Sequence, residues 1–216
     1  MQFDLLDNGI DSLKATGDIL LEHYLDYEFK RHQIKDALFH FVHGVEVLSK
    51  YLLKNDSESR IFKDHKKYRE ALKKMRKESL SSVFEANPYL ETITLSSALN
   101  KLKYDKSLTM DELLWDSLNQ LRLFRNEMMH YTVELDDDEF HVFVMEFRRT
   151  YNKTFFYFEK HIPNFKDKVN SVEREEGFTE YDKYLDQMEV MGMMAYETQL
   201  LDAEVDYYEA LEENHK

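Results

Sequence analysis

The sequence predicts an all-α protein, a helical bundle of four to five main helices followed by an acidic helical extension at the C-terminus. Only 5 Gly and 2 Pro occur among the 216 residues, which argues against a β protein with many turns. Hydrophobic residues recur at intervals of three and four positions over long segments, which is the period of an amphipathic helix. The chain is 43% hydrophobic and 14% aromatic, which is enough apolar material for a core.

Two long amphipathic helices are predicted at 4–29 and 31–54. Their hydrophobic residues are mostly three or four positions apart, so each helix has one apolar face. The polar run 55–57 then ends the second helix. The apolar positions are Leu6, Ile10, Leu13, Leu20, Tyr24 and Tyr27 in the first helix and Ile34, Leu38, Phe41, Val45, Leu48 and Leu52 in the second.

The next part of the chain has a weaker helical pattern. We predict a basic helix at 60–78 and shorter helical pieces at 80–86 and 92–103. Asn87-Pro88 indicates a turn between the short pieces. No convincing strand pattern occurs here or elsewhere in the chain.

Two further long helices are predicted at 110–130 and at about 136–161. Asp136 is a favourable N-cap for the second of them, and Pro163 ends it. Their apolar positions are Leu114, Leu118, Leu121, Met128, Phe140, Val144, Phe147, Tyr151, Phe155 and Phe158.

The net charge of −14 is concentrated near the C-terminus. Residues 171–216 contain 14 Asp and Glu but only 3 Lys and Arg. Residues 1–170 are nearly balanced, with 29 Asp and Glu and 26 Lys and Arg. A long acidic helix with apolar residues is predicted at 179–213. We therefore expect a helical bundle at 1–165 and an acidic extension at 166–216. Because a solvated tail would not need apolar residues, the extension is expected to dock, either as a structural part of the bundle or as an autoinhibitory cover.

The composition also argues against several classes of protein. The chain has no cysteine, and therefore no disulfide, no thiolate chemistry and no cysteine zinc site. No run of 18 uncharged apolar residues is present, and the N-terminus lacks the pattern of a signal peptide. We expect a cytoplasmic protein with no membrane partner, no cofactor and no metal. His40, His43 and Glu46 are the one set that a metal ion could use, and surface or network histidines are the commoner alternative.

The most informative residue is Arg125, which occupies a position where a core residue is expected. It continues the row of Leu114, Leu118 and Leu121 at steps of four and three positions. Arginine keeps its proton and is costly to bury without a partner. Polar residues gather on the flank beside this row. They are Asn119, Arg122, Asn126 and His130.

This flank has the side chains that bind and cleave a phosphodiester. A guanidinium is a fixed cation whose planar fork matches phosphate. Histidine gives and takes protons near neutral pH. The alternative is structural, since an arginine and a histidine on one helix commonly form a salt bridge or a polar contact.

A second candidate surface is the basic segment from Arg60 to Lys77. It contains nine Lys and Arg and only two acids, Asp64 and Glu70. Such a run is either a phosphate-facing patch or a solvated helix face. The candidate RNA-binding residues are Lys66, Lys67, Lys73 and Lys74.

Two segments resemble the HEPN superfamily (higher eukaryotes and prokaryotes nucleotide-binding domain). Residues 37–53 are similar to its second helix, with Glu46 and Lys50 at the positions of its Gly-hydrophobic-Glu-x3-Lys pattern. Residues 125–130, Arg-Asn-Glu-Met-Met-His, match its signature of Arg, a polar residue, a spacer and His. The resemblance covers about residues 5–162. It implies a four- or five-helix bundle that forms a homodimer through the motif region, and many members are metal-independent endoribonucleases.

The resemblance makes Arg125, Asn126 and His130 the expected catalytic residues. In a homodimer, two copies of His130 can share the roles of base and acid, and two copies of Arg125 can hold the phosphate. Asn126 is expected to orient the histidine ring or to donate to the phosphate.

Glu46, Arg122 and Tyr131 are expected to support this site. Glu46 is the candidate partner of Arg125, and the alternative is an ordinary helix pair with Lys50. Tyr131 is expected either to stack on a base or to pack against the bundle.

The sequence therefore predicts an endoribonuclease that acts on RNA, in a toxin–antitoxin or phage-defence system with an antitoxin or defence partner. The alternative is a non-catalytic HEPN-type scaffold that binds RNA, a nucleotide or a protein. In one toxin branch of the family a tyrosine two positions after the histidine is modified by its antitoxin. Thr132 stands at that position here, which argues against that form of control.

Overall fold

The computed structural model describes residues 4–22 and 30–172. These residues form helices joined by loops and turns. The only extended pairing among them is an isolated antiparallel bridge between Phe62 and Thr92. The chain divides into two compact units, 1–172 and 173–216. The second unit lies outside the described residues, and so do the helix predicted at 179–213 and the end of the first predicted helix.

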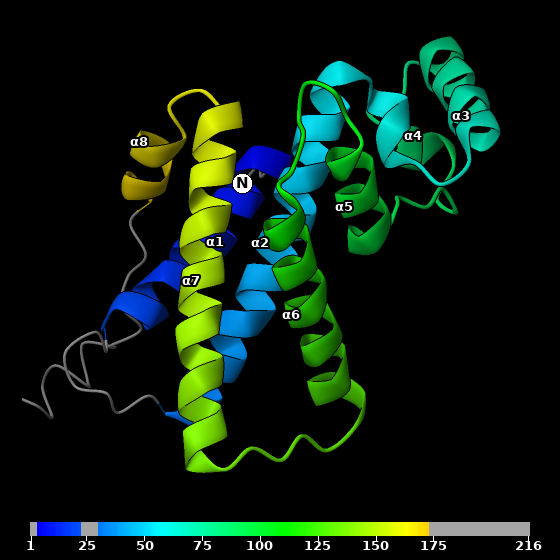
Figure 1. Ribbon diagram of the computed structural model, residues 1–216. Helices are drawn as coiled ribbons and strands as arrows, with labels where there is room; N and C mark the ends of the chain where they lie inside the picture. The colour runs from blue at the N-terminus through cyan, green and yellow to red at the C-terminus, as the bar shows by residue number, and fades with distance from the viewer. Residues whose placement is uncertain (1–3, 23–29, 173–216) are drawn as a thin grey trace, which may run out of the picture. The chain divides into compact units, whose positions relative to one another are not determined.

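The all-α prediction is confirmed for the described residues, and the helices predicted at 31–54, 110–130 and 136–161 begin and end close to their predicted limits. No helix in this part of the chain is both long and apolar enough to cross a membrane. The elements in chain order are α1 (Leu5–Glu22), α2 (Arg31–Asp56), the 3-10 helix η1 (Glu58–Ile61), α3 (His65–Glu78), α4 (Val83–Ala86), α5 (Leu95–Lys103), α6 (Glu112–His130), α7 (Asp137–His161) and α8 (Phe165–Asn170) (Figure 1).

Helix α2 is the helix around which the others pack. It contacts α1, η1, α5, α6 and α7, and its predicted apolar face is buried throughout. Phe41 of α2 meets Phe147 of α7 edge to face, with 5.2 Å between ring centroids. Both rings are completely buried, so this aromatic contact fastens α7 to the central helix.

Helices α1 and α2 approach closely because glycines line their contact. A Cβ atom on Gly9 would lie 2.5 Å from the side chain of Leu48, closer than carbon atoms can approach. A Cβ on Gly44 would lie 3.2 Å from the carbonyl oxygen of Gly9. Glycine at these two positions therefore lets the helix backbones come near enough to bury Leu48 between them.

Helix α7 begins with the predicted cap. Asp136 accepts a hydrogen bond from the Glu139 backbone N–H at 2.8 Å, and the Glu139 carboxylate accepts one from the Asp136 N–H at 3.1 Å. This capping box satisfies two N–H groups that a helix start leaves without partners. The helix ends at His161, two residues before Pro163, as the sequence indicated.

Helix α8 was not predicted, and it belongs to the bundle. Phe165 and Val169 are buried, and the helix contacts α1 and α7. The boundary expected at 165/166 would have separated this helix from its packing partners, and the division between compact units instead follows Val172.

A charged cluster joins the end of α2 to the loop before α6. The Arg60 guanidinium contacts the carboxylates of Asp56 and Asp105, each at 2.7 Å. The Asp105 carboxylate also accepts hydrogen bonds from the hydroxyl and backbone N–H of Ser107, at 2.8 and 2.9 Å. These bonds from Ser107 and Arg60 hold the pKa of Asp105 well below its usual value.

Asp105→Asn is therefore expected to lower the free energy of unfolding by about 2 kcal/mol at neutral pH, because charge-assisted hydrogen bonds are lost in a mostly buried site. The pKa of this carboxyl is lower in the folded state, so its contribution is present above the unfolded pKa and is lost as the pH falls below about 4. Urea unfolding from pH 7 to pH 3 should show a steeper acid loss for the wild type than for the variant.

The matched control is Asp137→Asn, since Asp137 also pairs with an arginine, Arg31, at 2.8 Å but is fully exposed. It should change the stability little. Equal decreases in the free energy of unfolding for both variants would contradict the stabilising role of the Asp105 cluster.

Candidate functional site

Arg125 lies on α6 where that helix faces α2. Leu121 and Leu118 are buried one and two turns earlier, and Arg125 continues their row in a half-buried position. Its guanidinium carbon lies 5.5 Å from the centre of the Phe39 ring on α2. Its Nη1 donates a hydrogen bond to the Asn126 side-chain oxygen at 3.0 Å.

The charge of Arg125 has no carboxylate partner among the described residues. The Nε atom is buried and has no hydrogen-bond partner there. An aromatic face and an amide oxygen stabilise a guanidinium, but neither neutralises it. The group is thus a fixed cation, partly desolvated and oriented, which is the state that favours binding of a phosphate.

The same flank of α6 holds a second arginine in a similar setting. Arg122 Nε lies 3.4 Å from the side-chain oxygen of Asn119, whose amide nitrogen donates to the Trp115 carbonyl at 2.9 Å. The ring of Trp115 in turn lies under the ammonium of Lys103 on α5, 4.1 Å from its centre, and that ammonium is paired with the Glu112 carboxylate at 3.0 Å. The flank of α6 therefore carries two arginines with amide neighbours.

His130 is the last residue of α6, and its side chain is exposed. This side chain makes no hydrogen bond within the part of the chain that the structure describes. The Asn126 side-chain oxygen accepts from Arg125 and the side chain makes no hydrogen bond to the histidine ring, so the expected orienting role is not seen, while donation to a phosphate stays a prediction. Tyr131 follows with 80% of its surface exposed, so it does not pack against the bundle.

The predicted pairing of Glu46 with Arg125 is wrong. Glu46 accepts a hydrogen bond from Lys50 at 2.6 Å, and the Lys50 ammonium also donates to the Thr92 hydroxyl at 3.1 Å. The Lys50 side chain is only 11% exposed. A buried ammonium needs a carboxylate nearby, and one turn of α2 brings the two together.

The basic candidates Lys66, Lys67, Lys73 and Lys74 all lie exposed on α3. Helix α3 lies beside α4, at the end of α6 opposite His130 (Figure 1). The structure therefore does not bring the basic segment and the motif into one site.

The histidine pair on α2 is not part of a metal site in this structure. Among the residues described, no group of three or more His, Asp or Glu is close enough to hold a metal ion. The Nε2 atom of His43 lies 3.4 Å from the side-chain oxygen of Asn8, and Glu46 is engaged by Lys50.

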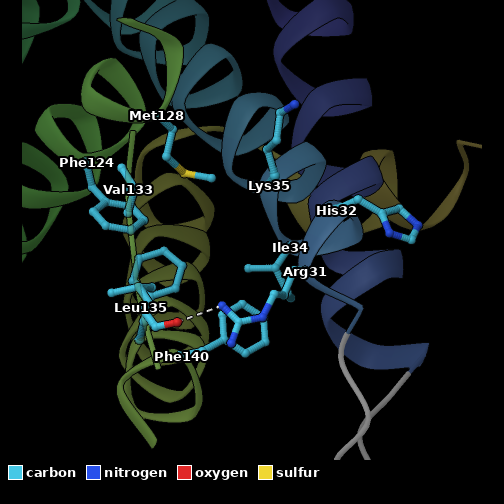
Figure 2. A pocket seen from close by; sticks show the side chains of 10 residues that line it. Arg31, His32, Ile34, Lys35, Phe124, Met128, Val133, Leu135 and Phe140 are labelled. Atoms are coloured by element: carbon cyan, nitrogen blue, oxygen red, sulfur yellow. Dashed lines mark hydrogen bonds between the residues drawn. The ribbon is translucent and has the colours of Figure 1, made fainter. Parts of the chain in front are cut away.

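An apolar pocket beside the motif was not predicted from the sequence. It has a volume of about 240 Å³ and lies between the start of α2, the end of α6 and the start of α7. In Figure 2 the Arg31 side chain extends toward Leu135 and Phe140, and Met128 lies across from Lys35. The lining residues are Arg31, His32, Ile34, Lys35, Phe124, Met128, Val133, Leu135, Phe140 and Phe143.

Arg31 closes one side of this pocket. It donates to the Leu135 carbonyl at 2.9 Å and lies 4.9 Å from the Phe140 ring centre. The sequence offered one indication of this pocket, because Phe124 and Phe143 add apolar surface beyond the face that α2 covers. Their rings pack against each other at a tilt of 37°, with 4.5 Å between centroids.

Arg125→Met is expected to keep the free energy of unfolding within about 1 kcal/mol of the wild type, or to raise it. An unbranched apolar side chain can cover Phe39 and removes a buried Nε that lacks a partner. Leu121→Ala is the matched core variant, since Leu121 is one turn earlier and buried, and it should cost about 2–5 kcal/mol. Urea unfolding followed by circular dichroism compares them. An equally large decrease in the free energy of unfolding for both variants would show that Arg125 has a structural role.

No protein-family model matches the chain, and neither a curated protein nor a solved structure gives a significant match.

Proposed function

We propose that this protein is a metal-independent endoribonuclease of the HEPN type. The observation that carries the proposal is the arrangement of Arg125, an oriented and partly buried cation without a carboxylate partner, five positions before an exposed histidine. A structural arginine would be expected to have a carboxylate to neutralise it. A phosphate in the backbone of RNA supplies that missing anion.

The reaction follows from these two side chains. A neutral histidine removes the proton from a ribose 2′-hydroxyl, and the resulting oxygen attacks the adjacent phosphorus. The bond from phosphorus to the 5′-oxygen breaks, and a protonated histidine gives that oxygen its proton. The products are a 2′,3′-cyclic phosphate and a 5′-hydroxyl, and Arg125 stabilises the negative charge that develops on the phosphate oxygens.

One chain supplies a single His130 to a reaction that uses a base and an acid. A two-fold dimer around the end of α6 would bring a second copy beside the first. Exposed apolar side chains at that end favour such an interface. Leu123 is 57% exposed and Met129 is 49% exposed, with Tyr131 next to them.

An RNA-cleaving protein of this kind fits a toxin or phage-defence effector in the cytoplasm, restrained by an antitoxin or another defence-system protein. The support is the resemblance of residues 37–53 and 125–130 to the HEPN superfamily together with the all-helical architecture. The role of the acidic segment 173–216 in such restraint concerns residues outside those described.

A non-catalytic binding protein of the same superfamily is the second candidate. The observation in its favour is the apolar pocket next to Met128, which is lined at its edge by the exposed Lys35 and by Arg31, whose guanidinium is paired with Asp137. Such a pocket suits a small ligand with an apolar body and an anionic group. Binding without cleavage would then be the activity of the chain.

The first test is cleavage of single-stranded RNA in EDTA, with the ends of the products identified by mass spectrometry. His130→Ala should abolish cleavage, and Arg125→Met should reduce it by at least about 100-fold, because the acid–base group and the charge stabilisation are each worth that much. His141→Ala and Arg149→Ala are the controls, as they change exposed residues on α7. Cleavage by His130→Ala at the rate of the wild type would reject the mechanism.

The second test is the oligomeric state. Leu123→Glu should convert a dimer to a monomer and abolish cleavage, since it places two like charges in an apolar interface. Phe156→Glu alters a residue that is 67% exposed on the far half of α7 and should leave the dimer intact. Light scattering at micromolar concentration measures the mass. An active wild-type monomer would contradict the two-chain site.

A further inference from the structure

Positive charge in residues 1–170 is concentrated in residues 60–77, a short basic lobe that includes most of α3. Residues 60–77 have nine basic and two acidic side chains, a net of +7, whereas the rest of residues 1–170 has a net of −10. A surface that is merely solvated needs no such separation of charge. The lobe therefore presents an isolated positive field to an anionic partner.

The fold turns the basic side chains of α3 toward solvent. Tyr68 and Ala71 are buried, and Asp64 fixes the start of the helix by accepting from the Lys66 and Lys67 backbone N–H groups at 2.8 and 3.0 Å. The opposite half of the helix carries almost only Lys and Arg. Its exposed basic residues are Lys66, Lys67, Arg69, Lys73, Lys74, Arg76 and Lys77.

One row of these cations runs beside the segment that follows α4. The Lys74 ammonium donates to the Ala86 carbonyl at 3.2 Å. Two turns earlier, Lys67 lines a shallow pocket of about 240 Å³ together with Tyr89 and Leu90. Two cations and two carboxylates line that pocket, with Lys63 and Glu91 ion-paired at 2.6 Å and Asp64 capping the helix, so the free charge beside Tyr89 comes from the exposed face of α3.

Tyr89 is held out in solvent beside this row. It is 88% exposed, the most exposed large hydrophobic residue among those described. The preceding Asn87 fixes its backbone, with the side-chain oxygen accepting from the Tyr89 N–H at 3.1 Å. An aromatic ring kept away from the core next to a row of cations is the arrangement that stacks on an unpaired base while the cations hold phosphates.

We infer that α3 and Tyr89 form a binding platform for single-stranded RNA, separate from the motif on α6. A base stacks on Tyr89, Lys67 contacts the adjacent phosphate, and the exposed row of Lys66, Lys73 and Lys77 on the neighbouring face of α3 contacts the phosphates that follow. A duplex keeps its bases stacked on one another and offers no free face to the tyrosine, so the platform selects single strands. The identification of the strand as RNA rests on the proposed endoribonuclease function. The platform adds to that function the class of its substrate, which is single-stranded RNA.

The position of the platform gives it a role in that function. It lies at the end of α6 remote from His130, so a strand that touches both must be several nucleotides long (Figure 1). Helix α6 alone, at 19 residues, spans about 28 Å at 1.5 Å per residue. The platform would therefore favour longer RNA over short fragments.

The test is fluorescence polarisation of the wild-type full chain with a labelled 12-nucleotide 2′-O-methyl oligouridine. This strand lacks the hydroxyl that attacks phosphorus, so binding is measured without cleavage. Tyr89→Ala should weaken binding about tenfold, and Lys67→Ala and Lys73→Ala should each reduce the slope of log affinity against log salt by about 0.7. Tyr104→Ala, which changes a tyrosine 79% exposed at the C-terminal end of α5, should bind as the wild type does.

Three results would overturn the platform. They are unchanged binding by Tyr89→Ala, equal or tighter binding of a duplex of the same length, and binding to anionic vesicles with none to the oligonucleotide. Circular dichroism of each variant establishes that it is folded. Because the probe cannot be cut, failure of this inference is distinct from failure of the proposed cleavage, which depends on His130.

Discussion

The burial of α2 is the constraint on which the rest of this structure depends. Four other helices and η1 pack on it, and Leu38, Phe41 and Leu48 are completely buried. A helix covered on so many sides has little freedom to shift, because a well-packed interior resists changes of even one methylene group. The residues on its remaining face are therefore held in fixed positions. One of them, Phe39, is the surface on which Arg125 lies.

The partners of the arginines distinguish structural charges from candidate binding groups. Three arginines outside α6 have carboxylates within 2.8 Å, whereas the hydrogen bonds of the two on α6 go to amide oxygens. The first group is Arg31 with Asp137, Arg60 with Asp56 and Asp105, and Arg149 with Glu146; the second is Arg122 with Asn119 and Arg125 with Asn126. An amide fixes the direction of a guanidinium and leaves its charge available, so the same chain contains both kinds of arginine for comparison.

The separation of the motif from the basic lobe suits a protein that handles a strand rather than a small molecule. Affinity for RNA comes largely from charge and stacking, while cleavage needs a few oriented groups. Under the proposed function, placing the two on different helices would let the lobe bind many sequences without crowding the reacting phosphate. The residues between them on α6 include Leu118 and Leu121, which are buried and give the helix its rigidity.

The sequence by itself determined the helices and their apolar faces, because the spacing of hydrophobic residues is a local property of the chain. It also identified the Asp136 cap and the position of Arg125 in the row of leucines. It did not predict α8, since six residues are too short to have a helical period, and burial of Phe165 and Val169 against α1 and α7 is what stabilises that helix.

Only the tertiary structure decided the partners of the charged residues. Glu46 has both Lys50 and Arg125 within plausible reach from the sequence, and the burial of Lys50 against Thr92 settles the choice. The structure also separated α3 from the motif and created the pocket beside Met128, because both depend on how helices far apart in the sequence pack. Local periodicity fixes which face of a helix is apolar, but the side chains that cross between helices are chosen by packing and by the cost of burying an unpaired charge.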